Sequence, residues 1–537
     1  MIQWRKPTAP RRLRTLPIPR GPVNIARQIF LRAAISGLSA VYAAYRVHPA
    51  VWRFTARNYH PKLEEFARLN AWMMCQHGFL DVPAYQDHLA RHGWEFRWWD
   101  LANYPETTKD NYVRRYTEQE RSWKGRLKTI GTVVDESSGS SGQPTNWMRS
   151  KSELYTIHKN LAGFTTMLHG SRNLFCINAF SMGAWATGTN TGLAMAQVAT
   201  VKNTGPDLDK ILDTMEHFGP GHTYLITAYP PFLKHVVDRM DQEPEKWRTY
   251  RINAFVGGEA MTEGLRDYLE ARLGRVYSGY GASDLTIGLG GETDLSVCIR
   301  KACVADPDFR RALLGEDEAR TPMIFQYNPL ETYLETTADD ELVVTLNTTA
   351  VMNPKLRYNI GDEATLYSFP EMMELLADHP RVEQNCRRAF RHQRMKLPFL
   401  LLYGRKDATI SYMGANIYPL DVENGLYGDQ RWAPHIESFR TELVEATDLE
   451  TRPVIHVELR ADAALTHTER TTMSAALAEG VVAHLASVSR DFRESLEEDA
   501  SAGEITVRLH EHRTAPSPAT TPSGSRTSTW SRTIKDT

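Results

Sequence analysis

The sequence has few cysteines and no long apolar run. Its 537 residues include only five cysteines, an odd number and mostly far apart, which excludes the disulfide framework of a small secreted protein. No stretch reaches the roughly 18 consecutive apolar residues of a membrane-spanning helix. We therefore expect a protein of the reducing cytoplasm that does not cross a membrane.

Only two of the cysteines, Cys298 and Cys303, lie close together in the sequence. Two thiols in a C-x4-C arrangement, with no second Cys or His pair nearby, are a poor zinc site. We favour two buried thiols here and keep zinc as the alternative.

A net charge of one sign is also lacking. The chain has 63 Lys and Arg against 65 Asp and Glu, so no overall field favours a nucleic-acid partner. Several catalytic motifs are absent as well, namely His-Glu-x-x-His, Gly-x-Ser-x-Gly and Gly-x-Gly-x-x-Gly. Their absence argues against a metalloprotease, a serine hydrolase and a dinucleotide oxidoreductase.

The first 63 residues are an exception to the charge balance, because they hold 12 Lys and Arg and no Asp or Glu. A signal peptide would need a stronger apolar core after this basic start. Residues 25–45 could instead form an amphipathic helix on an anionic membrane, with Arg27, Arg32 and Arg46 on its polar face. We favour a third interpretation, a solvated arm that leads into a helix packed on the main domain.

An α/β fold is predicted from alternating apolar runs and helix-like periods between residues 174 and 281. The expected strands are residues 174–180, 224–228, 252–256 and 276–280, and the expected helices are residues 208–218, 231–240 and 263–273. After Gly404 a strand at 454–459, a helix bearing Met473, Leu477, Val481 and Leu485, and a strand at 505–509 indicate a small second unit. We expect a large domain of sheets and helices over residues 1–404, with its basic arm at 1–63, and a small mobile α+β lid over residues 405–537. Residues 513–532, rich in Ser, Thr and Pro, should be a flexible connector or a surface loop.

A loop of hydroxyls and glycines follows an apolar run at residues 130–134. Backbone N–H groups and hydroxyls in such a loop can close on a phosphate, and the Gly-Lys-Ser/Thr ending of a Walker A loop is absent. Its sequence is Ser137-Ser138-Gly139-Ser140-Ser141-Gly142-Gln143-Pro144-Thr145.

This loop and four later segments resemble, in order and spacing, the motifs of the AMP-forming adenylating superfamily, which includes acyl-CoA synthetases, peptide-synthetase adenylation domains and luciferases. The later segments are Gly257-Gly258-Glu259-Ala260, Tyr280-Gly281-Ala282-Ser283-Asp284, Arg357-Tyr358-Asn359-Ile360-Gly361-Asp362, and Gly404-Arg405-Lys406-Asp407 followed by Tyr418-Pro419. The Gly-Gly-Glu and Tyr-Pro elements point to the branch of phenylacetate-CoA ligases and capsule-cluster ligases.

The resemblance implies an ATP-dependent ligase and a role for each matching residue. Ser283 and Asp407, the latter at the hinge, would serve catalysis, Asp284 would help hold Mg²⁺, and Lys535, the only lysine after Lys406, would be the lid cation. Nucleotide contacts would come from Ser137, Ser138, Gly139, Ser140, Ser141, Gly142, Gly258, Glu259, Tyr280, Gly281, Asp362 and Arg405. The acid would lie against Phe180, Trp185, Tyr229 and Gly279, whose rings suit a flat aromatic carboxylate.

Two residues depart from the family pattern. Gln143 stands where lysine is usual, which removes a positive charge near the outgoing pyrophosphate, and Asp284 replaces a glutamate. The expected reaction is formation of an acyl-adenylate and its transfer to CoA. The alternatives are transfer to an amine or another nucleophile, and a non-catalytic nucleotide-binding relative.

Overall fold

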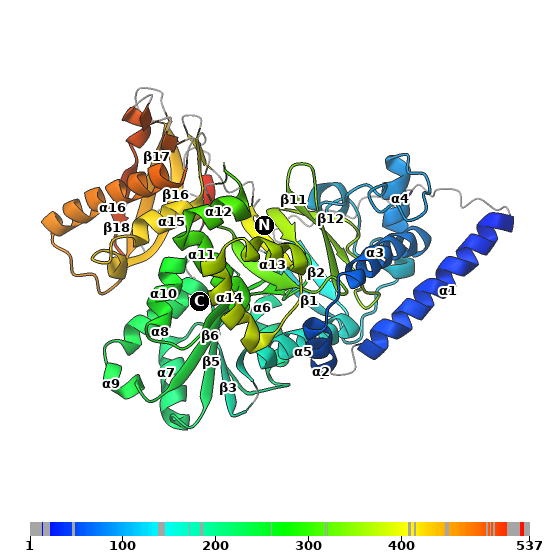
Figure 1. Cartoon of the computed structure of the whole chain (residues 1–537), viewed down its shortest axis with the longest axis horizontal. Coiled ribbons are helices and arrows are strands. Elements are labelled where there is room, and N and C mark those ends of the chain that lie inside the picture. Colours follow the sequence, from blue (N-terminus) through cyan, green and yellow to red (C-terminus); the bar gives the residue numbers. More distant parts are fainter. Residues whose placement is uncertain are drawn as a thin grey trace, which may run out of the picture.

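The computed structural model describes residue 13 and residues 22–45, 49–137, 145–170, 172–182, 186–258, 260–316, 318, 320–405, 410–412, 415–445, 451–489, 492–493, 496–497, 500–512 and 527–530. A large mixed α/β body carries a smaller unit at one end and a long helix, α1, at the other (Figure 1). None of the helices in the described ranges is long and apolar enough to cross a bilayer.

Half of an eleven-stranded central sheet is parallel. Its strands are ordered β7-β6-β5-β3-β4 and follow the predicted alternation with helices. The bounds are β3 (Leu174–Asn178), β4 (Thr200–Asn203), β5 (Thr223–Ala228), β6 (Arg251–Gly257) and β7 (Val276–Tyr280). The four strands expected from the sequence are therefore confirmed, and β4 is an added edge strand.

Helices cover both faces of this parallel half, because alternate side chains of each strand point to opposite sides. One face packs on α7 (Leu208–Phe218), α8 (Pro230–Met240) and α10 (Glu263–Glu270). The other face packs on α5 (Lys151–His169) and α6 (Ala186–Met195). The near-continuous apolar runs that predicted these strands reflect this double burial.

The other half of the sheet is antiparallel and continues from β7 in the order β8-β9-β13-β12-β11-β10. Its strands are β8 (Gly290–Gly291), β9 (Met323–Tyr327), β10 (Thr332–Thr336), β11 (Glu341–Leu346), β12 (Tyr358–Tyr367) and β13 (Phe399–Arg405). Four helices follow or interrupt these strands, namely α11 (Asp294–Ala305), α12 (Pro307–Leu314), α13 (Phe369–Ala377) and α14 (Pro380–Gln393).

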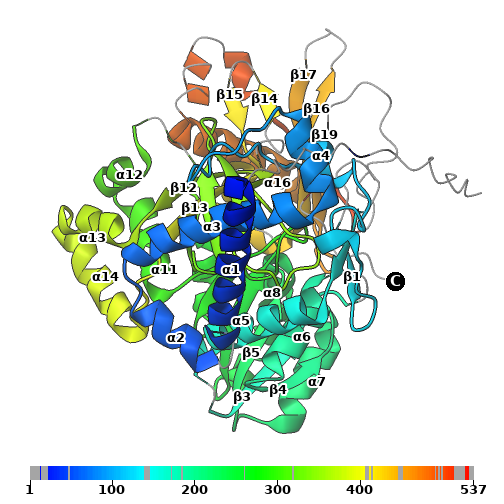
Figure 2. The same cartoon turned by 90° about the vertical axis from the view of Figure 1, so that its right-hand side faces the viewer.

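Four helices at the amino end flank this body. They are α1 (Pro22–Tyr45), α2 (Pro49–Arg57), α3 (Lys62–Asp81) and α4 (Pro83–Arg91). In Figure 2 α1 crosses the front of the molecule, and its inner side chains join a core cluster with α3 and α4. The helix expected in the basic arm is thus present and packed.

A second sheet forms the smaller unit with its own core. Its strands are ordered β18-β17-β16-β19 and are covered by α15 (Pro419–Tyr427) and α16 (His467–Val488). The strand bounds are β16 (Ile436–Glu445), β17 (Thr451–Leu459), β18 (Thr506–His510) and β19 (Thr527–Trp530), and a hairpin of β14 (Ile410–Tyr412) and β15 (Ala415–Ile417) precedes them. The four apolar residues predicted for the helix, from Met473 to Leu485, are all buried on α16.

The carboxyl-terminal segment differs in part from its expectation as a connector or surface loop. Residues 527–530 form β19, which pairs antiparallel with β16 through Arg440↔Trp530 and Thr441↔Ser528. Three hydroxyl residues followed by a tryptophan are enough for a strand when an open edge is beside them.

Candidate functional site

The site begins where β7 ends. Tyr280, the last residue of β7, donates a hydrogen bond from its hydroxyl to Asp362 Oδ2 on β12, at 2.6 Å. Both side chains are buried, and the Tyr280 ring stacks on Phe325 with 5.8 Å between the centroids. The bond joins two sequence-predicted residues that are 82 positions apart in the chain.

The turn after Tyr280 is tight and requires glycine. A Cβ atom at Gly281 would lie 2.8 Å from the backbone nitrogen of Gly288 and 3.0 Å from the carbonyl oxygen of Thr286. Backbone atoms cannot yield cheaply to such an approach. The loop that carries Ser283 and Asp284 is therefore folded back on residues 286–288.

Arg149 fixes this loop through hydrogen bonds to its backbone. Its guanidinium donates to the carbonyl oxygen of Ser283 at 2.6 Å and to that of Leu285 at 3.1 Å. The same group donates to the carboxylates of Asp135 at 2.6 Å and Glu153 at 2.9 Å. All three charged side chains are buried, so this is a network that fixes the backbone on both sides of Asp284. The sequence analysis missed Arg149, although it lies two residues after buried Trp147 and so on the same face of β2 (Thr145–Arg149).

Asp284 accepts a hydrogen bond from the hydroxyl of Tyr358 at 2.9 Å. Among the residues whose positions the structure gives, no three His, Cys, Asp or Glu side chains are grouped as a metal site. Mg²⁺ is commonly held by one or two carboxylates together with substrate phosphates and water, and a single aspartate at this place fits that mode.

A buried lysine, Lys355, lies behind the same loop. Its Nζ is 4.1 Å from the ring centroid of Trp147 and 5.2 Å from that of Tyr358, the residue bonded to Asp284. Burial lowers the pKa of Lys355 to about 7, and the charge of Arg121 acts in the same direction, whereas Asp284 opposes the shift. The sequence analysis overlooked this cation. The signal was a lone lysine between Pro354 and Leu356, two apolar residues.

The two strands on either side of the predicted phosphate loop show where the loop begins and ends. β1 (Val133–Ser137) and β2 pair antiparallel with Ser137 opposite Thr145, so their ends are adjacent and the sequence between them joins a hairpin. Several predicted residues lie outside the described part of the chain, namely Ser138, Gly139, Ser140, Ser141, Gly142, Glu259, Trp185, Asp407 and Lys535. For Ser137 and Arg405 the structure gives the backbone course only.

The predicted acid-binding residues fall into two groups. Phe180 and Tyr229 meet edge to face with 5.2 Å between their ring centroids. The Tyr229 ring lies against Gly258, where a Cβ atom would be 2.7 Å from it and where φ is +85°. Gly279 faces the opposite way, toward Phe255. Glycine at 258 thus lets an aromatic pair approach the backbone of the Gly-Gly-Glu segment.

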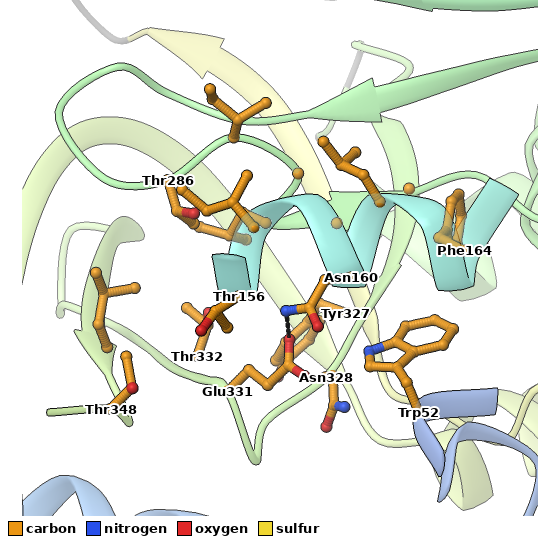
Figure 3. A pocket seen from close by; sticks show the side chains of 18 of the residues that line it. Trp52, Thr156, Asn160, Phe164, Thr286, Tyr327, Asn328, Glu331, Thr332 and Thr348 are labelled. Atoms are coloured by element: carbon orange, nitrogen blue, oxygen red, sulfur yellow. Dashed lines mark hydrogen bonds between the residues drawn. The ribbon is translucent and has the colours of Figure 1, made fainter. Parts of the chain in front are cut away.

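A cavity of about 80 Å³ lies on the α5 side of the sheet, below residues 286–291 (Figure 3). Leu161, Phe164 and Phe255 give it an apolar wall. Asn160 on α5 donates a hydrogen bond to Glu331 at its polar end, and the buried indole of Trp52 lies beside that pair. Thr286, two residues after Asp284, lines the cavity, so the cavity lies beside the loop that carries Asp284.

The cysteines do not form the C-x4-C pair that we weighed for zinc. Cys298 Sγ lies 3.0 Å from Cys386 Sγ on α14, whereas Cys303 is buried in the core near Arg310. All five cysteines are free thiols. Helical geometry explains the difference, because positions five apart on α11 point in different directions.

The smaller unit contacts the large body at α8. Arg460 pairs with Asp238, and His235 Nε2 lies 3.3 Å from Glu437 Oε2. At the start of α15, the ring of Tyr418 lies under the guanidinium of Arg320 at 4.5 Å. These contacts between the two units are made by charged and aromatic side chains.

This architecture is similar in fold to solved structures of a CoA ligase. No protein-family model and no curated protein sequence matches the chain. Among solved structures, 2-hydroxyisobutyryl-CoA ligase in the postadenylation state matches with a TM-score of 0.59 in complex with R3-HIB-AMP and 0.58 in complex with 2-HIB-AMP. In both cases the identity is 14%, over 85% of this chain and 87% of the ligase. The amide bond synthetase McbA from Marinactinospora thermotolerans matches with a TM-score of 0.43 and 15% identity, over 72% of this chain and 66% of that one.

Proposed function

We propose that the protein is an ATP-dependent, AMP-forming ligase that activates a carboxylic acid as its acyl-adenylate and passes the acyl group to CoA. The observation that carries this proposal is the convergence of Tyr280, Asp362 and the pinned Ser283–Asp284 turn at the carboxyl end of the parallel strands. Nucleotides bind at this edge in α/β sheets. The fold supports the same conclusion.

In the first step a carboxylate oxygen attacks the α-phosphorus, the bond to the bridging oxygen breaks, and pyrophosphate leaves. Negative charge gathers on oxygens that are already negative, so the protein contributes position and electrostatics. Asp362 would accept hydrogen bonds from the ribose hydroxyls, and the Ser283 hydroxyl would meet the phosphate. Asp284 would hold Mg²⁺, which neutralises phosphate charge when bound.

Lys355 supplies the cation that the sequence lacks at Gln143. Its Nζ lies over the ring of Trp147, which is two residues after the phosphate loop, and the charge of Asp284 acts on it. In the closed lid the resemblance assigns a further cation to Lys535, and the chain would rotate about Asp407. In the second step a thiolate attacks the acyl carbon and AMP leaves.

Two places beside the loop fit the organic part of the acid. The edge-to-face contact of Phe180 and Tyr229 supports an aromatic acid, since rings pack well on rings. The cavity of Figure 3 would instead take a small group with a hydrogen-bonding end, because Asn160 and Glu331 lie there. We favour the aromatic acid.

The direct test is ATP–pyrophosphate exchange with a panel of aromatic and hydroxylated acids, each with and without CoA. We expect acid-dependent exchange, and a thioester only when CoA is present. An acyl-AMP that accumulates with CoA but is consumed by an amine would identify the other acceptor. Tight ATP binding without exchange for any acid would identify a non-catalytic relative. A Tyr229→Leu variant should selectively lose exchange activity with aromatic acids, whereas Asn160→Leu should keep it.

ATP binding should be accompanied by proton uptake at Lys355. Its pKa in the free protein is about 7, so at pH 8 the amine is mostly neutral, and nearby phosphate charge favours the ammonium form. Affinity for ATP should therefore fall as the pH rises above 7, by up to about tenfold per pH unit. Calorimetry at pH 8 in two buffers of different protonation enthalpy measures the uptake.

The Lys355→Met variant should show little uptake, and Lys202→Met, which removes an exposed lysine from β4, should behave like the wild type. The same shift affects folding with a definite sign. Because the folded pKa lies below the unfolded value near 10.5, the unfolded chain holds more protons between these values, and the free energy of unfolding should rise with pH across that window. Equal proton uptake in the variant would remove Lys355 from the nucleotide site.

A further inference from the structure

The outer face of α1 is apolar although it faces solvent. Ile25, Ile29, Phe30 and Val41 are between 51% and 64% exposed. Ala26, Ala33, Gly37 and Ala40 are also exposed on this helix. An exposed helix face of a soluble protein is normally polar, so a continuous apolar strip of this kind marks an interaction surface.

The inner face of the helix already has its partner. Leu31 and Ile35 are buried in the cluster formed with α3 and α4. Arg27, expected on a polar outer face, lies instead over the ring of Phe96 at 3.9 Å from its centroid, because that aromatic ring is on the inner side. Arg27 is therefore not on the polar outer face that the membrane-helix alternative gave it.

Arg32 and Ser36, polar residues on the exposed side among the described side chains of α1, each have a partner within the protein. Arg32 pairs with Asp81 at 3.2 Å, at the edge of the strip. Ser36 donates its hydroxyl to the carbonyl oxygen of Arg32, in the same helix, at 2.8 Å. The Ser36 hydroxyl is therefore satisfied within the helix, and the half-exposed Arg32 guanidinium can stay at headgroup level at the edge of the strip.

The charge of the sequence around α1 indicates which kind of partner covers the apolar strip. Residues 1–20 contain six Lys and Arg and no acid, directly before α1, and the next acid in the sequence is Glu64. A second copy of the chain would bring two such basic segments together, which opposes that pairing. An anionic bilayer offers both negative headgroups for the cations and an acyl boundary for the apolar strip.

We propose that α1 lies in the interface of an anionic membrane, with Ile25, Ile29, Phe30 and Val41 inserted toward the acyl chains. With 24 residues the helix is about 36 Å long. It lies at the far end of the molecule from the smaller unit, so membrane contact leaves that unit free (Figure 1). The proposal is independent of the reaction.

The test is co-sedimentation of the full-length protein with vesicles of phosphatidylcholine alone or mixed with phosphatidylserine. We expect binding to the mixed vesicles only, weakened by salt. The double variant Ile29→Glu and Phe30→Glu should bind at least about tenfold more weakly, because two apolar side chains no longer enter the bilayer. Val304→Glu, at a 55% exposed site on α11, is the matched control and should bind like the wild type.

A thermal unfolding midpoint equal to that of the wild type would show that each variant is folded. Absence of binding to the phosphatidylserine vesicles would overturn the proposal, as would equal binding by the double variant. A wild-type dimer in analytical ultracentrifugation that the double variant abolishes would assign the strip to a second copy instead.

Discussion

Replacing Arg149 with methionine is expected to lower the free energy of unfolding by about 3–5 kcal/mol, the cost of removing one partner from a buried ion pair. The variant leaves the carboxylates of Asp135 and Glu153 buried without their cation. It also removes the donor to the carbonyl oxygens of Ser283 and Leu285, so ATP affinity should fall in the fraction that still folds. Urea unfolding and calorimetry measure the two effects.

The control for Arg149 is Arg248→Met, which breaks an ion pair with Glu245 on the surface, where both side chains are more than 70% exposed. Exposed pairs contribute little, so a change below about 1 kcal/mol is expected there. Adding Asp135→Asn and Glu153→Gln to the Arg149 variant should recover part of the loss, because amides tolerate burial better than unpaired carboxylates. A single variant as stable as the wild type would contradict the role of the network.

Replacing Asp362 with alanine should weaken ATP binding by about 1.5–3 kcal/mol, the scale of hydrogen bonds to a charged group. The sharpest measurement compares ATP with 2′-deoxy- and 3′-deoxy-ATP by calorimetry. The wild type should discriminate against the deoxy nucleotides, and the variant should not, because the carboxylate that would read the hydroxyls is gone.

Tyr280→Phe separates this effect from the loss of the Tyr280–Asp362 hydrogen bond. It removes the same bond but leaves the carboxylate, so discrimination between ATP and its deoxy analogues should persist. If Asp362→Ala still discriminates as the wild type does, another group binds the ribose.

The parallel half of the sheet could be predicted from the sequence because its signal is local. Strands buried on both faces are apolar throughout, and the helices between them repeat at three and four, so β7 and α7 coincide with their predicted bounds. The antiparallel half could not be predicted in this way. β13 pairs with β9, about 75 residues earlier, and no local pattern specifies such a partner.

The site residues also divide into those with a local sequence signal and those without one. Tyr280 and Asp362 were found because they sit in recognisable motifs, and the structure places them in contact. Arg149 and Lys355 were missed because each acts through surroundings assembled from distant segments. A buried arginine or lysine becomes informative only when its partners are known, and those partners, Ser283 and Trp147 among them, come from other elements.

The end of β13 has a consequence for how ligands and domain orientation are linked. Arg405, its last residue, is opposite Asp362 in the register of β12 and β13, and the chain leaves the large body there. A reorientation of the smaller unit would start one strand away from Asp362, the residue proposed to bind the ribose. By thermodynamic reciprocity, whatever factor the orientation applies to ATP affinity, ATP applies to the orientation. A substrate that favours one arrangement of the two units would then act as an allosteric effector of nucleotide binding, without touching the nucleotide.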